Sequence, residues 1–282
     1  MVLVVYKYKH ISIYIYMGFI ITILAGGEGK RMRSSVPKVL HLFDGKPILV
    51  RILEVAIALS PDKIVVVTGK FHRQIQRSLE KYISTVSEIL FVEQPEALGT
   101  GNAVNVCLPH YTNDDDEVLI LNGDMPLLTR NVVDRLVRSR GASGGTIVTS
   151  ILENPTGYGR IIYKLESQGQ RFEIVEEAAC TWEEMTVREV NVGMYLFRAS
   201  VLKKCVPYLP YHPSKREYYF TDVVQMAFEA GLQVFSCQLE EKENYMVRGV
   251  NTPEELKELE QLFHTMGSTE PFMESQHVEN EM

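Results

Sequence analysis

The residues best suited to bind an anion lie in a glycine-rich, basic turn at residues 24–38, LAGGEGKRMRSSVPK. Its glycines, among them Gly26 and Gly27, allow backbone N–H groups to approach an anion closely and to form a concave nest around it. Arg31 and Lys38 follow, and their long cationic side chains carry the charge that complements a polyphosphate. The turn therefore predicts a site for a phosphate-bearing ligand.

The charge balance indicates that this ligand is a small molecule. The net charge of the chain is −7, so broad, salt-dependent binding to nucleic acid is not expected. Residues 28–51 nevertheless hold six Lys or Arg residues against Glu28 and Asp44. A basic run is often only a solvated face, but this one directly follows the glycine turn, which favours a binding function.

Two common phosphate-binding signatures do not fit the turn. A dinucleotide fingerprint starting at Gly27 would need a third glycine where Met32 stands. A Walker loop would need a glycine in place of Leu24, and Ser or Thr in place of Arg31. The turn must therefore belong to another class of nucleotide- or phosphate-binding protein.

A candidate metal ligand follows a second apolar run. Asp124 comes directly after VLILNG, and ligands of open α/β sheets bind at the carboxyl ends of parallel strands. An Asp after Asn-Gly is also a common turn residue, so both interpretations stay open at this point. The four cysteines and seven histidines show no zinc-ligand spacing, which fits a reduced, intracellular enzyme without a structural metal.

These residues need a sheet to position them, and the hydrophobic pattern predicts one. In the first half, short apolar runs alternate with amphipathic helical stretches, as in βαβ units of a parallel sheet with helices on both faces. After Gly141 the strand-like runs lie close together, so we expect an α+β continuation of the same domain. The predicted fold class is α/β, with a mostly parallel mixed sheet. The predicted strands are 19–24, 63–68, 88–92 and 118–121, then GTIVTSIL, GRIIYKLE, RFEIVEE and VNVGMYLF.

The ends of the chain differ from the middle in composition. Residues 1–16 could form an extra edge strand, but we favour the simpler interpretation that the working domain begins at Met17 and covers residues 17–264. Its last element should be a helix with Thr252 as the N-cap. Residues 265–282 are polar and acidic and are expected to be disordered. No run approaches the roughly 20 apolar residues that span a bilayer, so no membrane partner is expected.

The order LAGGEGKRM…PKVL resembles the signature of nucleotidyltransferases that make nucleoside-diphosphate sugars. Later motifs narrow the resemblance to the N-acetylglucosamine-1-phosphate uridylyltransferase family, and within it to the N-terminal, pyrophosphorylase half of the bacterial bifunctional enzymes. The resemblance covers roughly residues 19–262. The later motifs are EQPEALGTGNA (93–103), LNGDMPL (121–127), NPTGYGRI (154–161), IVEE (174–177), EVNVGM (189–194), REYYFTDVV (216–224) and VRGVN (247–251).

The resemblance implies a Rossmann-like nucleotidyltransferase fold, with a nucleotide-binding part at about residues 17–140 and a sugar-binding part at about 141–264. It implies transfer of UMP from UTP to N-acetylglucosamine 1-phosphate in the cytoplasm, giving UDP-N-acetylglucosamine and pyrophosphate, with Mg²⁺ as cofactor. The other half of the bifunctional enzymes is an acetyltransferase of hexapeptide repeats. The sequence has no such repeat, so acetyl transfer is expected to be absent; the oligomeric state is left open.

The resemblance also assigns residues to the nucleotide. Asp124 and Asn251 would bind Mg²⁺, which prefers oxygen ligands. Arg31, Lys38 and Asp124 would be the catalytic residues, and the carboxamide of Gln94 would offer uracil both a donor and an acceptor. The residues assigned to nucleotide binding are Leu24, Ala25, Gly26, Gly27, Lys38, Gln94, Gly99, Thr100, Asn122, Gly123 and Asp124.

On the sugar side, the resemblance implies that Glu176 accepts hydrogen bonds from sugar hydroxyls. It also implies that Asn191 forms a hydrogen bond with a hydroxyl or with the acetamido group. Tyr219 and Thr221 would shape the acetamido pocket, and Gly159 would donate a backbone N–H. The residues assigned to sugar binding are therefore Gly159, Glu176, Asn191, Tyr219 and Thr221.

Three positions depart from the family pattern. Lys30 stands where the family usually has Thr, and Ala97 replaces a side-chain amide often seen near the base. No lysine follows Glu176, so Lys38 or Arg31 would have to hold the sugar phosphate. Two alternatives stay open: a related transferase with another base or with glucose or mannose 1-phosphate, and a catalytically silent relative that only binds a nucleotide sugar.

Overall fold

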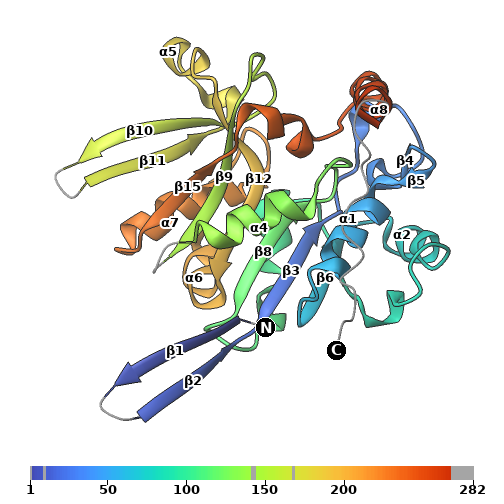
Figure 1. Ribbon diagram of the computed structural model, residues 1–282. Helices are drawn as coiled ribbons and strands as arrows, with labels where there is room; N and C mark the ends of the chain where they lie inside the picture. The colour runs from blue at the N-terminus through green and yellow to red at the C-terminus, as the bar shows by residue number, and fades with distance from the viewer. Residues whose placement is uncertain (1, 9–10, 141–143, 167–168, 268–282) are drawn as a thin grey trace.

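The structure is a computed structural model that describes residues 2–8, 11–140, 144–166 and 169–267. Its centre is a nine-stranded mixed sheet (Figure 1). Seven strands follow one another in the order β11-β10-β12-β8-β3-β6-β7, while β9 pairs with β12 and β15 pairs with β9. The predicted α/β fold is confirmed.

The first half of the chain builds the parallel part of the sheet. β3 (Phe19–Leu24) is parallel to both β6 (Lys63–Thr68) and β8 (Glu117–Asn122), and β6 is parallel to β7 (Leu90–Glu93). These strands are near-continuous apolar runs because both faces of the sheet are covered. The helices between them are α1 (Ile48–Ala58), α2 (His72–Leu79) and α3 (Gly99–Asn105), and α4 (Arg130–Arg138) follows β8.

Alternate side chains of each strand enter two separate hydrophobic cores. Ile21 and Ile23 of β3 pack in one core with residues of α1, α2 and α4. Ile20, one position away, packs in the other core with residues of α3. Successive side chains of a strand point to opposite faces, so the helices cover both sides of the sheet, as predicted.

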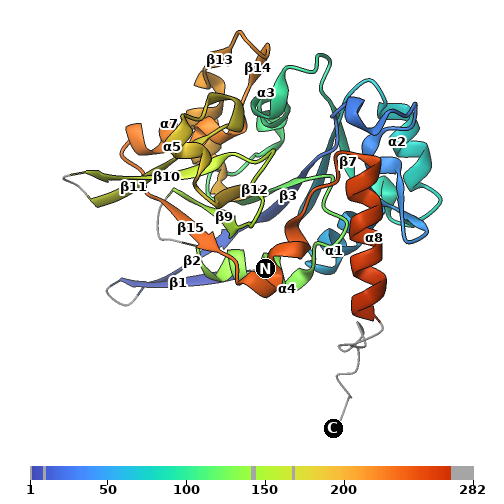
Figure 2. The same ribbon diagram turned by 90° about the horizontal axis from the view of Figure 1, so that it is seen from above.

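The second half adds mostly antiparallel strands. β12 (Glu189–Arg198) runs antiparallel to β8, β9 (Gly145–Ile151) and β10 (Arg160–Glu166), and β10 pairs antiparallel with β11 (Gly169–Val175). β15 (Val234–Gln238) returns parallel to β9. In Figure 2 the short hairpin of β13 (Tyr211–His212) and β14 (Glu217–Tyr218) lies beside α3, so segments from both halves meet there. The remaining elements of this half are α5 (Trp182–Met185), α6 (Ala199–Cys205) and α7 (Val223–Glu229).

The C-terminal helix α8 (Pro253–Gly267) packs against the first half of the chain. Phe263 lies edge-on to Phe43, at the end of the short strand β4 (Leu42–Phe43) that pairs with β5 (Lys46–Pro47). The backbone N–H of Glu255 donates to the hydroxyl of Thr252, which confirms the predicted N-cap. The helix covers residues 265–267 of the predicted tail, and residues 268–282 lie outside the described part of the chain.

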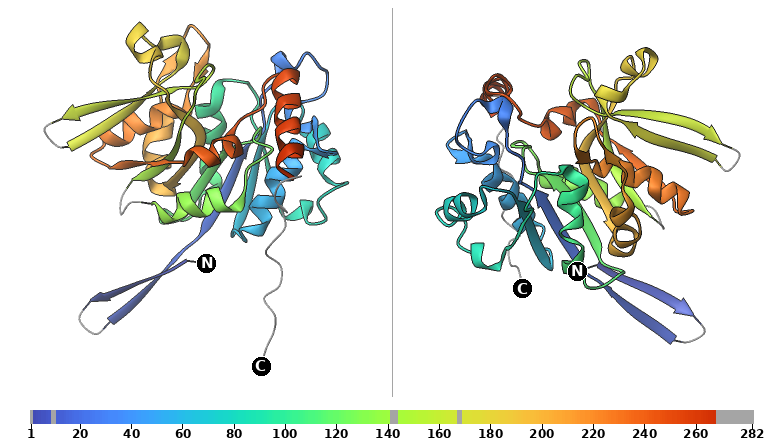
Figure 3. Two further views of the ribbon diagram at one scale, coloured as in Figure 1. Left: turned by 45° about the horizontal axis from the view of Figure 1, so that its top comes forward. Right: turned by 180° about the vertical axis from the view of Figure 1, so that it is seen from behind.

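The N-terminal strands β1 (Val2–Tyr8) and β2 (Ile11–Met17) pair only with each other. Figure 3 shows this hairpin projecting from the sheet in two further orientations. The structure therefore places no edge strand from residues 2–8 or 11–17 on the central sheet. Among the described residues, no helix has the length and apolarity to cross a membrane.

Candidate active site

Two adjoining cavities open at the carboxyl ends of the parallel strands. The larger has a volume of about 610 Å³ and the smaller about 200 Å³. Every residue that the sequence assigned to the nucleotide or the sugar lines one of them, except Ala25. Seven residues line both cavities, which therefore form one continuous cleft: Leu24, Arg31, Thr100, Asn122, Asp124, Glu176 and Asn251.

The glycine turn forms one wall of the larger cavity. Ala25 extends β3, because its N–H donates to the carbonyl of Val67 at 2.8 Å, and its side chain is buried beneath the turn. Gly26 crosses the end of β6 so closely that an added Cβ would lie 3.3 Å from the backbone of Thr68. The turn is thus pinned to the end of the sheet, with Gly27 exposed toward the cavity.

A left-handed residue ends the turn. Gly29 has a φ of 62°, and a Cβ there would lie only 2.7 Å from the Cβ of Lys38. Only glycine fits both the backbone conformation and this close approach. The turn and Lys38 are therefore packed directly against each other.

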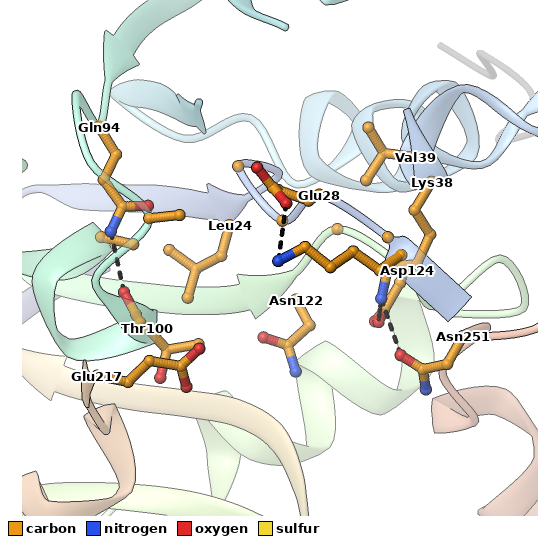
Figure 4. Close-up of a pocket in the computed structure, with 18 of the residues that line it drawn as sticks. Leu24, Glu28, Lys38, Val39, Gln94, Thr100, Asn122, Asp124, Glu217 and Asn251 are labelled. Carbon is orange, nitrogen blue, oxygen red and sulfur yellow. Dashed lines mark hydrogen bonds and ion pairs between the residues drawn. The ribbon is translucent and has the colours of Figure 1, made fainter. Parts of the chain in front are cut away.

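Lys38, Asp124 and Asn251 converge at the floor of the cleft (Figure 4). The Nζ of Lys38 lies 2.5 Å from Asp124 Oδ2 and 3.0 Å from Asn251 Oδ1. The side chains of Lys38 and Asp124 are only 16% and 15% exposed. The two predicted metal ligands therefore point one oxygen each at the same cationic group.

The backbone holds these two ligands together. The N–H of Val250 donates to the carbonyl of Asp124 at 2.9 Å, so the residue before Asn251 is tied to the end of β8. The N–H of Asn251 donates to the carboxylate of Glu255 in the first turn of α8 at 2.6 Å. Gly249 gives Asp124 room, because an added Cβ would lie 3.2 Å from Asp124 Oδ1. An all-oxygen donor set of one carboxylate and one amide fits Mg²⁺, which usually keeps several water ligands.

The side chain of Gln94, which was expected to offer a ligand both a donor and an acceptor, differs from that expectation. The Nε2 of Gln94 donates to the carbonyl of Gly99 at 3.0 Å and to Asn102 Oδ1 at 2.8 Å. Both amide protons are therefore used within the protein, where the N terminus of α3 turns back toward the strand end. The Oε1 atom faces Gly26 and is the part of the carboxamide left for a ligand.

The loop at the N terminus of α3 also joins the two halves of the cleft. The hydroxyl of Thr100 accepts a hydrogen bond from the N–H of Phe220 at 3.0 Å. The carbonyl of Leu98 accepts from the N–H of Tyr218 at 2.8 Å. Residues predicted to contact the base and residues predicted to contact the sugar are thus held by the same short segment, residues 217–222.

The polar groups on the sugar side bond one another. The hydroxyl of Thr221 donates to Glu176 Oε1 at 2.8 Å. Burial raises the pKa of Glu176, while the Thr221 hydrogen bond acts in the opposite direction and the charge of Asp222 adds to the rise. Asn191 is similarly engaged, since its Nδ2 donates to the hydroxyl of Tyr195 at 2.7 Å. These groups are fixed in position before any ligand binds.

A β-bulge in β12 brings the two sides together. The pairing register between β12 and β9 shifts between Asn191 and Tyr195, and Gly193 within the bulge has a φ of 78°. A Cβ on Gly193 would lie 2.0 Å from the Nδ2 of Asn122. Glycine at this position therefore allows β12 to approach the end of β8.

A comparison with known families decides the class of protein. A family model described as the MobA-like NTP transferase domain matches residues 21–176, more than half of the chain. The chain belongs to this nucleotidyltransferase family. The motif resemblance noted in the sequence is thereby supported over the half of the chain that contains the glycine turn, Gln94, Asp124 and Glu176.

Curated relatives of this nucleotidyltransferase confirm the resemblance more closely. A protein of Acanthamoeba polyphaga mimivirus named "Probable UDP-N-acetylglucosamine pyrophosphorylase" is 38% identical over 243 residues, covering 85% of this chain and 94% of that protein. The "Bifunctional protein GlmU" of Paraburkholderia phymatum is 37% identical over 242 residues, covering 86% of this chain but 51% of that protein. The chain thus spans about half the length of the bifunctional relatives, and it is a sugar-phosphate nucleotidyltransferase.

A solved structure shares the fold. A Bacillus anthracis protein assigned as a glucose-1-phosphate thymidylyltransferase, in complex with a sucrose, superposes with a TM-score of 0.64 at 19% sequence identity. The match covers 86% of this chain and 94% of that one. At this identity the likeness concerns the fold alone, and it confirms the nucleotidyltransferase architecture.

Within the nucleotidyltransferase cleft, Tyr219 is placed differently from its predicted neighbours. It lines the larger cavity, whereas Thr221 lines the smaller one. Its ring packs against His212 at a centroid distance of 4.5 Å, and His212 in turn pairs with Asp222 at 2.7 Å. The aromatic ring of Tyr219 is therefore packed against His212 at the end of β13, a residue that does not line either cavity.

Other lining residues were not singled out from the sequence. Glu217 and Glu28 line the larger cavity, and Tyr158 lines the smaller one. Lys70 and Lys30 hydrogen-bond to Glu28 and lower its pKa, so this carboxylate is paired with cations beside the glycine turn. Glu217 and Tyr158 lie inside recognised motifs, REYYFTDVV and NPTGYGRI, and those motifs were the signal that could have identified them.

Proposed function

We propose that this nucleotidyltransferase transfers UMP from UTP to N-acetylglucosamine 1-phosphate, giving UDP-N-acetylglucosamine and pyrophosphate. The observation that carries the proposal is the convergence of Lys38, in the larger cavity, on Asp124 and Asn251, which line both cavities. A reaction that joins two phosphorylated substrates needs positive charge at such a junction. The names of the most similar relatives support the choice of substrates.

The nucleophile needs no general base. A phosphate monoester has a second pKa of about 6, so the sugar phosphate is largely dianionic at neutral pH. Its oxygen would attack the α-phosphorus of UTP in line with the departing pyrophosphate. Catalysis then consists of positioning and charge stabilisation, for which a cleft of fixed hydrogen-bonding groups and cations is suited.

The larger cavity would hold UTP. The Oε1 of Gln94 would accept the N3–H of uracil, and Asn122 and Gly123 would border the ribose. The N–H groups of Gly26 and Gly27 would surround the phosphates, and Arg31 would add charge at the cavity mouth. The wall formed by the glycine turn is therefore the anionic end of the substrate site.

Asp124 and Asn251 would hold Mg²⁺. When bound, Mg²⁺ would neutralise charge at the α-phosphate and on the leaving pyrophosphate. Asp124 supplies the only formal negative charge of this pair, so its removal should have the largest effect. Asn251 would fix the ion's position through a neutral oxygen.

The smaller cavity would hold the sugar. Glu176 would accept hydrogen bonds from sugar hydroxyls, with Thr221 orienting its carboxylate. Asn191 and the backbone of Gly159 would complete this wall, and Tyr219 would close it toward the nucleotide. Arg31 borders both cavities, so it would also contact the sugar phosphate and take the place of the lysine missing after Glu176.

Pyrophosphate release tests this proposal. The full chain with Mg²⁺ should release pyrophosphate from UTP only when N-acetylglucosamine 1-phosphate is present. Parallel reactions with CTP or GTP, or with glucose or mannose 1-phosphate, should be much slower. Faster turnover with another pair would replace the substrate assignment, and binding of UDP-N-acetylglucosamine without turnover of any pair would indicate the silent relative.

A further inference from the structure

Lys38 lies where a metal ion would have to lie to contact Asp124 and Asn251 together. Its Nζ is 2.5 Å from Asp124 Oδ2 and 3.0 Å from Asn251 Oδ1. The ion pair is largely shielded from solvent, so the repulsion between an ammonium and a divalent cation at this spot is weakly screened. The ammonium and the metal therefore cannot use these two oxygens at the same time.

The base of the Lys38 side chain is held in place, whereas its end is not. The following residues, Val39 and Leu40, are buried in the core, and the Cα and Cβ of Lys38 pack against the backbone of Gly29. A lysine has a flexible four-carbon stem and a compact terminal charge. Rotation of this stem alone would carry the Nζ from Asp124 and Asn251 toward the glycine turn, because the two ligands and the turn line the same cavity.

We infer that Lys38 is an internal cation that compensates the metal site of the free protein and leaves it when metal and nucleotide bind. The inference rests on the proposed function, since it takes Asp124 and Asn251 as metal ligands. A polyphosphate provides Lys38 with a new anionic partner and so frees the two oxygens. Metal and nucleotide then strengthen each other's binding by the same factor, and metal alone binds weakly.

Mn²⁺ binding to the nucleotide-free full chain tests the inference without any turnover. Free Mn²⁺ is measured by electron paramagnetic resonance during titration of the wild-type protein and of Lys38→Met, which keeps the length of the side chain and removes its charge. The dissociation constant of Mn²⁺ should fall by at least about tenfold in Lys38→Met. Lys46→Met is the matched control, because Lys46 pairs with Glu54 on the exposed surface, and it should stay within about twofold of wild type.

A thermal measurement protects the test against a variant that folds poorly. Lys38→Met leaves Asp124 without its counter-charge, so its melting temperature should be lower than that of the wild type. Mn²⁺ should raise the melting temperature of this variant by more than that of the wild type, since at a given concentration a ligand that binds more tightly stabilises the folded protein more. Lys38→Gln, which keeps a polar end, should also show a lower melting temperature than the wild type and a larger rise with Mn²⁺.

Asp124→Asn separates the two ways in which the inference can fail. If wild type and Lys38→Met bind Mn²⁺ equally well, and Asp124→Asn abolishes both, the metal site stands and the competition by Lys38 is wrong. If Asp124→Asn changes Mn²⁺ binding in neither background, the metal does not bind at Asp124. That result would overturn the inference and the metal assignment of the proposed function together.

Discussion

The nucleotide side and the sugar side of the cleft are built in opposite ways. On the nucleotide side the charged groups come from loops at the ends of parallel strands, and their partners are other charges: Lys38 pairs with Asp124, and Glu28 pairs with two lysines. On the sugar side the polar groups bond to neutral neighbours, as Glu176 does to Thr221. The difference matches the ligands proposed for them.

A polyphosphate is recognised mainly by charge, and charges can exchange partners when it binds and leaves. A sugar is neutral apart from its phosphate, and it differs from other sugars in the direction of its hydroxyl groups and in neutral substituents such as an acetamido group. A wall that distinguishes sugars must therefore hold its hydrogen-bonding groups in fixed directions. We expect substitutions on the nucleotide side to change turnover and substitutions on the sugar side to change selectivity or stability.

The largest expected effect is on the nucleotide side. Asp124→Asn keeps the shape of the side chain and an oxygen near Lys38 but removes the negative charge that would hold Mg²⁺. Turnover should fall by about 10³-fold or more, while the protein stays folded with a lower melting temperature, because Lys38 loses its shielded counter-charge. Pyrophosphate release and thermal unfolding measure the two effects.

Asp134→Asn is the control for this change, because Asp134 lies on α4 and pairs only with Arg130, at 3.4 Å, in the described structure. It should leave turnover unchanged. Activity of Asp124→Asn within about tenfold of wild type would show that turnover does not depend on this charge. It would contradict the view that the nucleotide side acts mainly through charge.

The second prediction concerns the bulge that joins the sides. Gly193→Ala should destabilise the protein by about 2 kcal/mol, because a left-handed residue other than glycine costs roughly 1–2 kcal/mol and the new Cβ would also meet Asn122. Urea unfolding measures the loss. The KM for both substrates should rise, since Asn122 lines both cavities.

Gly231→Ala separates backbone strain from the clash. Gly231 has a φ of 75° after α7, but an added Cβ there meets nothing within 4 Å. This variant should lose stability through strain alone and keep the substrate KM values of the wild type. Equal losses in the two variants would mean that Asn122 moves aside freely and that the approach of β12 does not depend on Gly193.

The parallel half of the fold could be predicted from the sequence because its signals are local. The strands Phe19–Leu24 and Lys63–Thr68 are continuous apolar runs with turns at each end, and the structure has them with the predicted bounds. Glycine spacing in the turn and the position of Asp124 after a buried strand are local in the same sense. Local patterns suffice where consecutive residues build the feature.

Features that depend on how the folded chain brings particular side chains together could not be predicted. The bulge at Gly193 brings β12 close to Asn122, which is 71 positions away in the chain (193 − 122). The donors of Gln94 are used by Gly99 and Asn102 because α3 turns back on the strand end. Lys38 was expected at the phosphates, and it lies on Asp124 and Asn251 because its stem is long enough to reach them.

The third prediction tests whether fixed direction matters on the sugar side. Thr221→Val keeps the shape of a buried side chain and removes the hydroxyl that orients Glu176. The KM for the sugar phosphate should rise about tenfold, because a hydrogen bond to a charged group contributes roughly 1.5–3 kcal/mol. The KM for UTP should change less than about twofold. Thr186→Val, at an exposed position of the same half, is the control and should change neither KM. An equal rise of both KM values in Thr221→Val would contradict a sugar site that is separate from the nucleotide site.

The smallest expected effect is a gain in stability from Glu176→Gln. Burial raises the pKa of Glu176 above its usual 4.5, so the folded protein binds this proton more tightly than the unfolded chain does. Stability that the carboxyl group contributes when protonated is therefore lost as the pH rises from below 4.5 through the raised pKa. Glutamine keeps an acceptor for the Thr221 hydroxyl and never takes a charge.

The free energy of unfolding of Glu176→Gln minus that of wild type should therefore be near zero at about pH 4 and reach up to about 1 kcal/mol near pH 8. Asp222, whose pKa is also raised by burial, is present in both proteins, so its contribution largely cancels in the difference. Glu183→Gln, on the exposed helix α5, should show a smaller change with pH. A difference that is constant or falls with pH would mean that Glu176 is well solvated, and that the sugar side does not hold its carboxylate at a cost in stability.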